Sequence, residues 1–255
     1  MTDVRDGHCA VVIVAAGSGQ RLGHGVPKAR VPLGGEPLLV HAVRGVLRAA
    51  VAEQICVAIP ANDPELAEIC RRLGAEAAAA GLKFNAVEGG ADRAASVAAA
   101  LRHISGDVGC VLVHDAARPL TPTGVFKRVV AALRDGADAV IPALAVTDTI
   151  KTVVPAALPA TGAGVEQVVG TPARHQLRAV QTPQGFTLDT LRRAHAQTLD
   201  AGTQVTDDAM LVEAMGGDVF VVQGSTHSFK ITTPMDLLLA EAMLEGPLRP
   251  RWVEG

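Results

Sequence analysis

Short apolar runs alternate with helical stretches along most of the sequence, and this alternation limits the possible folds more than any other feature. The first run, Ala10–Ala16, is closed by glycines and is expected to form a buried strand. Similar runs follow at Ile55–Ile59, Val111–Val113 and Ala139–Ile141. The stretches between the runs are typical of helices: Leu38–Ala50, Pro64–Leu73, Ala94–Ile104 and Val125–Leu133. Because β-α-β alternation brings strands together in parallel, we expect an α/β fold with a mostly parallel sheet and helices on both faces.

The alternation breaks after Ile141, where two strand-like segments follow without a helix between them. These segments are Val146–Val154 and Val165–Gln181, and the residues that join them, Pro155–Gly164, have the alanine, proline and glycine content of a loop. We therefore expect a two-stranded arm, at about 144–181, that projects from a single domain spanning residues 1–255.

The earlier pattern resumes after the arm. We expect helices near Leu188–Leu199 and Asp208–Met215, and a strand at Val219–Val222. A last helix is expected to begin at Pro234, with Thr233 as its N-cap and Asp236 three residues later in a capping box.

Composition and charge exclude several kinds of protein. The 255 residues contain no apolar run of membrane-span length, and the first nine residues are too polar for a signal peptide. The four cysteines are far apart and form no C-x-x-C pair, so we expect neither zinc nor disulfides but reduced thiols in a cytoplasmic protein. A formal net charge of −3 argues against nucleic acid as a partner. Any anionic ligand must then be held by a few placed cations.

A glycine-rich turn follows the first expected strand and carries the strongest functional signal. Gly17 and Gly19 would let backbone N–H groups approach phosphate oxygens, and Arg21 and Lys28 supply the positive charge that a triphosphate requires. The turn is not a P-loop, because no Gly-Lys-Ser/Thr follows, and its glycine spacing differs from the dinucleotide-binding fingerprint. A plain strand-to-helix turn with solvated cations is the alternative.

Two further segments carry candidate functional residues. The segment 89–96 (GGADRAAS) enters an expected helix, with Asp92 as a candidate N-cap and Arg93 beside it. Asp115 ends an expected strand, and the carboxyl ends of parallel strands face the crevice in which α/β proteins bind ligands. Magnesium needs few carboxylates when the substrate supplies phosphates, so one Asp suffices. The alternatives are a simple helix start with an exposed Arg93, and Asp115 as a turn former.

With these residues, the sequence resembles nucleotidyltransferases of the sugar-nucleotide pyrophosphorylase type, whose signature is G-x-G-x-R followed by Pro-Lys. Over nearly the whole chain it is similar to the 2-C-methyl-D-erythritol 4-phosphate cytidylyltransferase family of the non-mevalonate isoprenoid pathway. Beyond the segments above, the resemblance is carried by 148–151 (DTIK), Arg174, 181–184 (QTPQ), 206–208 (TDD) and 230–234 (KITTP). It implies a Rossmann-like fold of the nucleotide-diphospho-sugar transferase type. It also implies a Mg²⁺-dependent transfer of the cytidylyl group of CTP to methylerythritol phosphate, in a homodimer that exchanges its arms.

The resemblance further implies a role for each candidate residue. CTP would be lined by the backbone of Ala15, Ala16, Gly17 and Gly19, with Gly90, Arg93, Ser96 and Ala116 around its cytosine and ribose. Arg21 and Lys28 would hold the triphosphate, and Asp115 would coordinate the metal. The acceptor would be contacted by Arg118, Thr182 and Lys230 of one subunit and by Thr149 and Arg174 on the arm of the other. The candidate catalytic residues are therefore Arg21, Lys28, Arg174 and Lys230.

Three other functions stay open on the sequence. A ribitol 5-phosphate cytidylyltransferase, or a related sugar-phosphate nucleotidyltransferase, would share the scaffold, and in the first case also the nucleotide. An NAD-dependent dehydrogenase would need a strict G-x-G-x-x-G and an acid after the second strand, which instead ends in the segment 59–62 (IPAN). A non-catalytic nucleotide-binding regulator would be expected to lack Lys28, Asp115 or Lys230, and all three are present.

Overall fold

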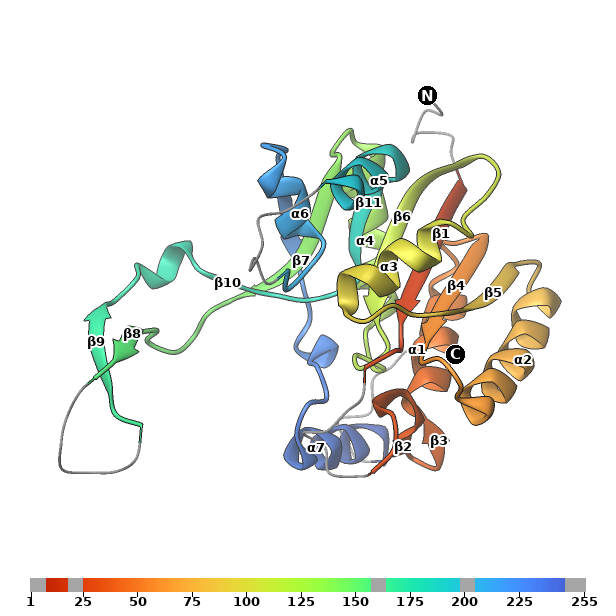
Figure 1. Ribbon diagram of the computed structural model, residues 1–255, viewed down its shortest axis with the longest axis horizontal. Helices are drawn as coiled ribbons and strands as arrows, with labels where there is room; N and C mark the ends of the chain where they lie inside the picture. The colour runs from red at the N-terminus through yellow and green to blue at the C-terminus, as the bar shows by residue number, and fades with distance from the viewer. Residues whose placement is uncertain (1–7, 18–24, 157–163, 198–204, 246–255) are drawn as a thin grey trace.

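A mixed, mostly parallel sheet forms the centre of the molecule (Figure 1). The computed structural model describes residues 8–17, 25–156, 164–197 and 205–245. Within these residues the strand order is β10-β7-β11-β6-β1-β4-β5, and β12 pairs with β7. The parallel strands are β1 (His8–Val14), β4 (Gln54–Ile59), β5 (Lys83–Glu88), β6 (Val108–Asp115), β7 (Ala139–Ala145) and β12 (Phe220–Gln223). The antiparallel strands are β10 (Arg178–Val180) and β11 (Gln184–Thr187).

Helices cover both faces of this sheet because its central strands bury side chains on both sides. On one face, Cys9, Val11 and Ile13 of β1 pack in a cluster with α1 (Leu38–Ala49), α2 (Pro64–Ala79) and α4 (Thr123–Arg134). On the other face, Ala10 and Val12 pack with α3 (Arg93–Leu101), α5 (Leu188–Ala196) and α6 (Ala209–Ala214). The expected α/β fold with helices on both faces is therefore confirmed. None of the helices in the described ranges is long and apolar enough to cross a membrane.

The strands that the apolar runs predicted are all present, but two strands of the sheet were not expected. Strand β5 lies at the edge of the sheet and is only partly buried, so its sequence has no continuous apolar run. Strand β11 has only four residues, and its single large apolar side chain, Phe186, follows Gly185 and lies between polar ends, Gln184 and Thr187. A Cβ added at Gly185 would lie 2.4 Å from Cγ1 of Val129 and 2.9 Å from Cδ1 of Leu133. Helix α4 thus packs directly on the backbone of β11.

The arm is present but is shorter than the sequence predicted. Strands β8 (Thr152–Pro155) and β9 (Glu166–Gly170) form an antiparallel ribbon that projects away from the sheet (Figure 1). The expected second strand, Val165–Gln181, is wrong as a single element. It divides into β9, the short helix η3 (Arg174–Gln176) and β10, which pairs with β7 in the main sheet. Most of the expected loop, residues 157–163, lies outside the described residues.

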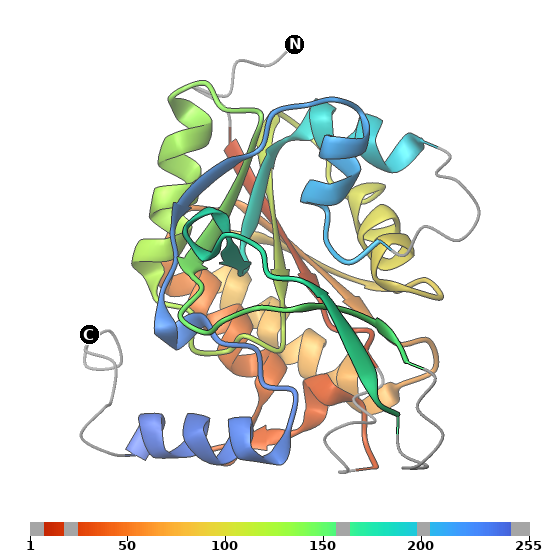
Figure 2. The same cartoon turned by 90° about the vertical axis from the view of Figure 1, so that its left-hand side faces the viewer.

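A third apolar cluster joins the C-terminal helix to a small hairpin on the N-terminal side of α1. The hairpin consists of β2 (Pro32–Leu33) and β3 (Glu36–Pro37). The helix is α7 (Pro234–Glu245), drawn in blue at the bottom of Figure 2. The expected capping box is confirmed, because Thr233 Oγ1 accepts from the Asp236 N–H at 3.3 Å and the Asp236 carboxylate accepts from the Thr233 N–H at 2.8 Å. These contacts fix the segment just before α7, which contains Lys230.

Candidate active site

A cavity of about 530 Å³ opens at the carboxyl ends of β1 and β6, where α/β proteins bind ligands. Four segments that are distant in the sequence form its wall: the end of β1, the loop before α3, the end of β6 and the segment before α7. Ten of the predicted site residues line it: Ala15, Ala16, Gly17, Lys28, Gly90, Arg93, Ser96, Asp115, Ala116 and Lys230. Gly19 and Arg21 lie outside the described residues.

Lys28 reaches the cavity because the chain turns back after the glycine-rich segment. Its backbone N–H donates to the carbonyl of Gly17 at 3.2 Å, and Lys28 then opens the short helix η2 (Lys28–Arg30). The strand end opposite is fixed by bonds from the N–H of Ala15 to Ala58 and from the N–H of Ala116 to Val14. The bond between Lys28 and Gly17 holds these two residues side by side, and both line the cavity.

The loop before α3 is held by the Ser96 hydroxyl. It donates to the carbonyl of Asp92 at 2.7 Å and accepts from the N–H of Gly90 at 3.1 Å. Asp92 is the N-cap of α3, as expected, and accepts from the N–H of Ala95 at 2.7 Å. A Cβ at position 90 would lie 2.3 Å from the Cβ of Ala95, so only glycine fits there. The backbone of this loop consequently forms the cavity wall without intervening side chains.

Asp115 is an acidic side chain at the centre of a group of cations in the cavity wall. Its carboxylate lies 2.8 Å from Nζ of Lys230, 3.4 Å from Nε of Arg93 and 4.0 Å from Nε of Arg118. Burial alone would raise the pKa of Asp115, but the attraction of Lys230 and Arg93 outweighs burial and holds the pKa well below its usual value. Asp115 is therefore an anion surrounded by cations at any ordinary pH.

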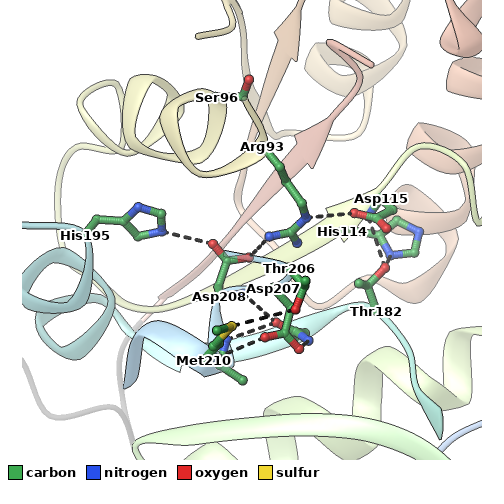
Figure 3. A network of polar contacts seen from close by, with 12 residues as sticks. Arg93, Ser96, His114, Asp115, Thr182, His195, Thr206, Asp207, Asp208 and Met210 are labelled. Atoms are coloured by element: carbon green, nitrogen blue, oxygen red, sulfur yellow. Dashed lines mark hydrogen bonds and ion pairs between the residues drawn. The ribbon is translucent and has the colours of Figure 1, made fainter. Parts of the chain in front are cut away.

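Arg93 is not the exposed residue that a simple helix start would give. Its side chain is 19% exposed, and its Nη1 lies 2.6 Å from the carboxylate of Asp208 (Figure 3). Burial lowers the pKa of Arg93, but the Asp208 and Asp115 carboxylates outweigh burial and raise it above its ordinary value. Its Nη2 is buried and has no hydrogen-bond partner within the described parts of the chain. The Nη2 donors of Arg93 are thus not used by the contacts with Asp208 and Asp115.

Thr182 and His114 support Asp115 from behind. The Thr182 hydroxyl accepts from the N–H of Asp115 at 3.0 Å, and it lies 3.0 Å from Nδ1 of the buried His114 (Figure 3). The hydroxyl can donate its own hydrogen to Nδ1, an arrangement that goes with the tautomer of His114 protonated on Nε2. Burial lowers the pKa of His114 to about 4. No role was expected for His114, because a single histidine before an acid has no distinctive spacing.

Of the five predicted acceptor-binding residues only Lys230 lines the cavity; the other four, Arg118, Thr149, Arg174 and Thr182, do not. The Arg118 guanidinium donates to the backbone carbonyls of Ser228 at 2.6 Å and Val180 at 3.3 Å. Thr149 and Arg174 are exposed on the flanks of the arm, and Arg174 Nη1 donates to the carbonyl of Thr147 at 2.7 Å. In the part of the chain that the structure describes, Thr149 and Arg174 are therefore not among the residues that line the cavity.

A divalent metal ion fits this cavity only together with a phosphate ligand. Within the described ranges, His, Cys, Asp and Glu form no group of three or more that could hold a metal ion alone. Asp115 and Asp92 both line the cavity, and Mg²⁺ commonly binds one or two carboxylates together with substrate phosphates and water. The donor set therefore matches Mg²⁺ bound to a nucleotide triphosphate and not a resident structural metal.

Comparison with known proteins gives a consistent family. The family model described as 2-C-methyl-D-erythritol 4-phosphate cytidylyltransferase matches residues 9–246. Relatives with the same description come from Streptomyces avermitilis, 48% identical over 92% of this chain and 91% of the relative, and Nocardia farcinica, 47% identical over 94% and 95%.

Solved structures agree with these relatives. The 2-C-methyl-D-erythritol 4-phosphate cytidylyltransferase of Thermus thermophilus is 37% identical, with a TM-score of 0.70 over 92% of this chain and 98% of that chain. The 4-diphosphocytidyl-2C-methyl-D-erythritol synthase of Anaerococcus prevotii is 27% identical, with a TM-score of 0.77 over 94% and 99%.

Proposed function

This chain belongs to the 2-C-methyl-D-erythritol 4-phosphate cytidylyltransferase family, and from that membership we propose how its cavity carries out the reaction. The enzyme transfers the cytidylyl group of CTP to 2-C-methyl-D-erythritol 4-phosphate, giving 4-diphosphocytidyl-2-C-methyl-D-erythritol and pyrophosphate. The observation that carries the assignment to this cavity is the placement of Lys28, Arg93 and Lys230 around the single acid Asp115.

In the proposed mechanism, a phosphate oxygen of the acceptor attacks the α-phosphorus of CTP. The new P–O bond forms as the bond to the departing pyrophosphate breaks, and no proton needs to move because the phosphate dianion is already nucleophilic. The residues contribute by positioning and by charge: Lys28 and Arg21 hold the triphosphate and stabilise the charge that develops at the α-phosphoryl group. Lys230, with its side chain 41% exposed, is placed to bind the acceptor phosphate.

We further propose that Asp115 binds Mg²⁺ together with CTP. When bound, the ion neutralises the triphosphate and polarises the α-phosphoryl group. The ionised state of Asp115, its position at the end of β6 and its place in the cavity wall support this assignment.

We also propose a homodimer in which the arm of one chain completes the site of the other. Two observations support it. Val153, Val154, Val168 and Val169 are all exposed on the ribbon, and an isolated two-stranded ribbon is marginally stable in water. In addition, Arg174 and Thr149 are exposed and do not line the cavity of their own chain, so their predicted contact with the acceptor is readily explained by a second subunit. Contacts of Arg118 and Thr182 with the acceptor stay predictions from the family resemblance.

A cytoplasmic location completes the proposal. It is supported by the state of the four cysteines, Cys9, Cys56, Cys70 and Cys110, which are all buried and free. Burial raises the pKa of Cys56 and of Cys70 to about 12, so both thiols are protonated and unreactive.

The function is tested by measuring pyrophosphate release from CTP with each candidate acceptor. We expect turnover with 2-C-methyl-D-erythritol 4-phosphate to exceed turnover with ribitol 5-phosphate, and ATP, GTP and UTP to be poor donors. Equal or better turnover with ribitol 5-phosphate would overturn the acceptor and leave the cytidylyl transfer intact. No pyrophosphate release with any acceptor would overturn the reaction itself.

A further inference from the structure

Two segments that carry the family resemblance have no role in the mechanism so far, and the structure joins them. The side-chain carbonyl of Gln184 accepts from the N–H groups of Asp208 at 3.2 Å and Ala209 at 3.3 Å. Its amide nitrogen donates to the Asp207 carboxylate at 2.8 Å, and that carboxylate also caps the N–H of Met210 at 3.0 Å. Gln184 on β11 therefore fixes the start of α6, and with it the direction of the Asp208 side chain.

Asp208 is fully buried, and both of its carboxylate oxygens are used. Oδ2 lies 2.6 Å from Nη1 of Arg93, and Oδ1 lies 2.9 Å from Nε2 of His195 on α5 (Figure 3). A buried carboxylate is costly unless it is paired and hydrogen-bonded, and here each oxygen has a donor. The side chain is aimed at the cavity wall and does not line the cavity itself.

Arg93 lies between two acids that compete for it. Its contact with Asp208 is 2.6 Å long and its contact with Asp115 is 3.4 Å long, so Asp208 is the closer partner. If Asp115 were the only counterion of Arg93, a metal ion could reach Asp115 only by separating that pair inside a poorly solvated site. A second, buried counterion removes this conflict for Arg93, because Arg93 stays neutralised when Asp115 binds a cation. The 2.8 Å contact of Asp115 with Lys230 is separate, and it can exchange for another because the Lys230 side chain is 41% exposed.

We propose that Asp208 is a positioning residue for nucleotide binding: it holds the Arg93 guanidinium at the cavity wall and leaves the Asp115 carboxylate available to a bound cation. His195 assists by fixing the Asp208 carboxylate from the opposite side. The proposal rests on the proposed function, because it takes CTP as the ligand of the cavity.

A purely structural role is the competing explanation, since Asp208 also ties the start of α6 to α5 through His195, a contact that does not involve Arg93. The two explanations differ in what happens when Arg93 is removed. A positioning residue acts through Arg93 and has nothing left to position without it, whereas a structural tether supports the fold around the cavity by other contacts as well.

The first experiment measures CTP binding by calorimetry at saturating Mg²⁺, with no acceptor. Asp208→Asn should weaken CTP binding about tenfold, the scale for the loss of one charged hydrogen bond. Asp189→Asn removes the same charge from an exposed position on α5, away from Arg93, and should leave CTP binding unchanged. Unchanged binding in Asp208→Asn, with normal binding in the wild type, would overturn the positioning role. Failure of the wild type to bind CTP would instead overturn the nucleotide assignment of the cavity.

The second experiment repeats the titration in an Arg93→Ala background. Adding Asp208→Asn to Arg93→Ala should change CTP binding less than twofold, because the interaction is already absent. A further tenfold loss in that background would establish the structural role and reject the proposal.

The third experiment uses His195, whose substitution is milder and guards against misfolding of Asp208→Asn. His195→Gln keeps a donor for Asp208 and should bind CTP like the wild type, whereas His195→Leu should bind it several-fold more weakly. In turnover assays, Asp208→Asn should also raise the Mg²⁺ concentration for half-maximal rate, because Arg93 then relies on Asp115. Identical CTP affinities for the two His195 variants would remove His195 from the arrangement.

Discussion

Nζ of Lys230 lies 2.8 Å from the carboxylate of Asp115, and beside this pair the N–H of Ile231 donates to the carbonyl of Ala117 at 2.9 Å. A backbone hydrogen bond thus joins the segment after β6 to the segment before α7 at the same place as the ion pair. The buried Ile231 and the capping box that follows it hold this segment in place. The cation that we assign to the acceptor phosphate is consequently positioned by the same contacts that dock the C-terminal helix.

Asp115→Asn should weaken the response of the enzyme to magnesium. The amide keeps the shape of the side chain but loses the charge that attracts a cation, so we expect the Mg²⁺ concentration for half-maximal rate to rise at least about tenfold. A magnesium titration of initial rates measures this. Asp135→Asn, at the exposed C-cap of α4, is the charge-matched control. An unchanged titration would reduce Asp115 to a counterion for Lys230.

Lys28→Ala and Arg21→Ala should each lower kcat by a factor of about 100 or more. Each variant removes a donor that we assign to the transition state, and that is the usual cost of one such donor. Lys127→Ala, on an exposed turn of α4, is the control for loss of a charge. Steady-state kinetics with a thermal melt of each variant checks the prediction. A variant that keeps most of its kcat would have lost only a solvated charge.

Mixing two inactive variants should restore activity if the site is shared between chains. In a heterodimer of Lys28→Ala and Arg174→Ala, one site would carry both substitutions and the other neither. Random reassembly should then return about a quarter of the wild-type activity, by counting intact sites in a two-fold dimer. If Arg174 acts within its own chain, every site lacks one residue, and activity stays at the level of the separate variants.

Stability should fall in mild acid because His114 resists protonation in the fold. Its pKa is lowered by burial from 6.5 to about 4, so between these values the unfolded chain binds a proton that the native protein does not. This contribution is fully present above the unfolded pKa and is lost as the pH falls toward 4, by about 2 kcal/mol between about pH 7.5 and pH 5.

Urea unfolding of the wild type and of His114→Gln at both pH values measures this effect. The variant should show a pH dependence smaller by that amount, whatever its stability at neutral pH. Parallel pH dependences in the two proteins would show that His114 already binds a proton in the native state.

The sequence predicts those parts of the fold in which burial is continuous. Strands β1, β4, β6 and β7 have apolar residues on both faces, so each appears in the sequence as a continuous apolar run. Strand β5 is half-exposed at an edge and β11 contains a glycine, so neither produces a run. The division of the arm into β9 and β10 depends on pairing with β7, which no local pattern contains.

The site shows the same division. Some site residues can be predicted from local pattern and from the family resemblance. Asp115 ends a strand, and Lys28 and Arg93 each open a helix. The partner of Arg93 is Asp208, 115 residues further along the chain, and only the packing of α3 against α5 and α6 brings the two together. Thr182 was predicted from the resemblance, but its hydroxyl bonds inward to Asp115 and His114, a use that depends on the register between β11 and β6.

Because α4 packs closely on β11, only glycine fits at position 185. A methyl group there would meet Val129 and Leu133 from the covering helix, and those two residues belong to the main apolar cluster. In a saturation-mutagenesis library scored for expression of folded protein alone, position 185 should therefore tolerate fewer substitutions than the charged residues of the cavity. Libraries that vary the acceptor side of the site should therefore keep Gly185 unchanged.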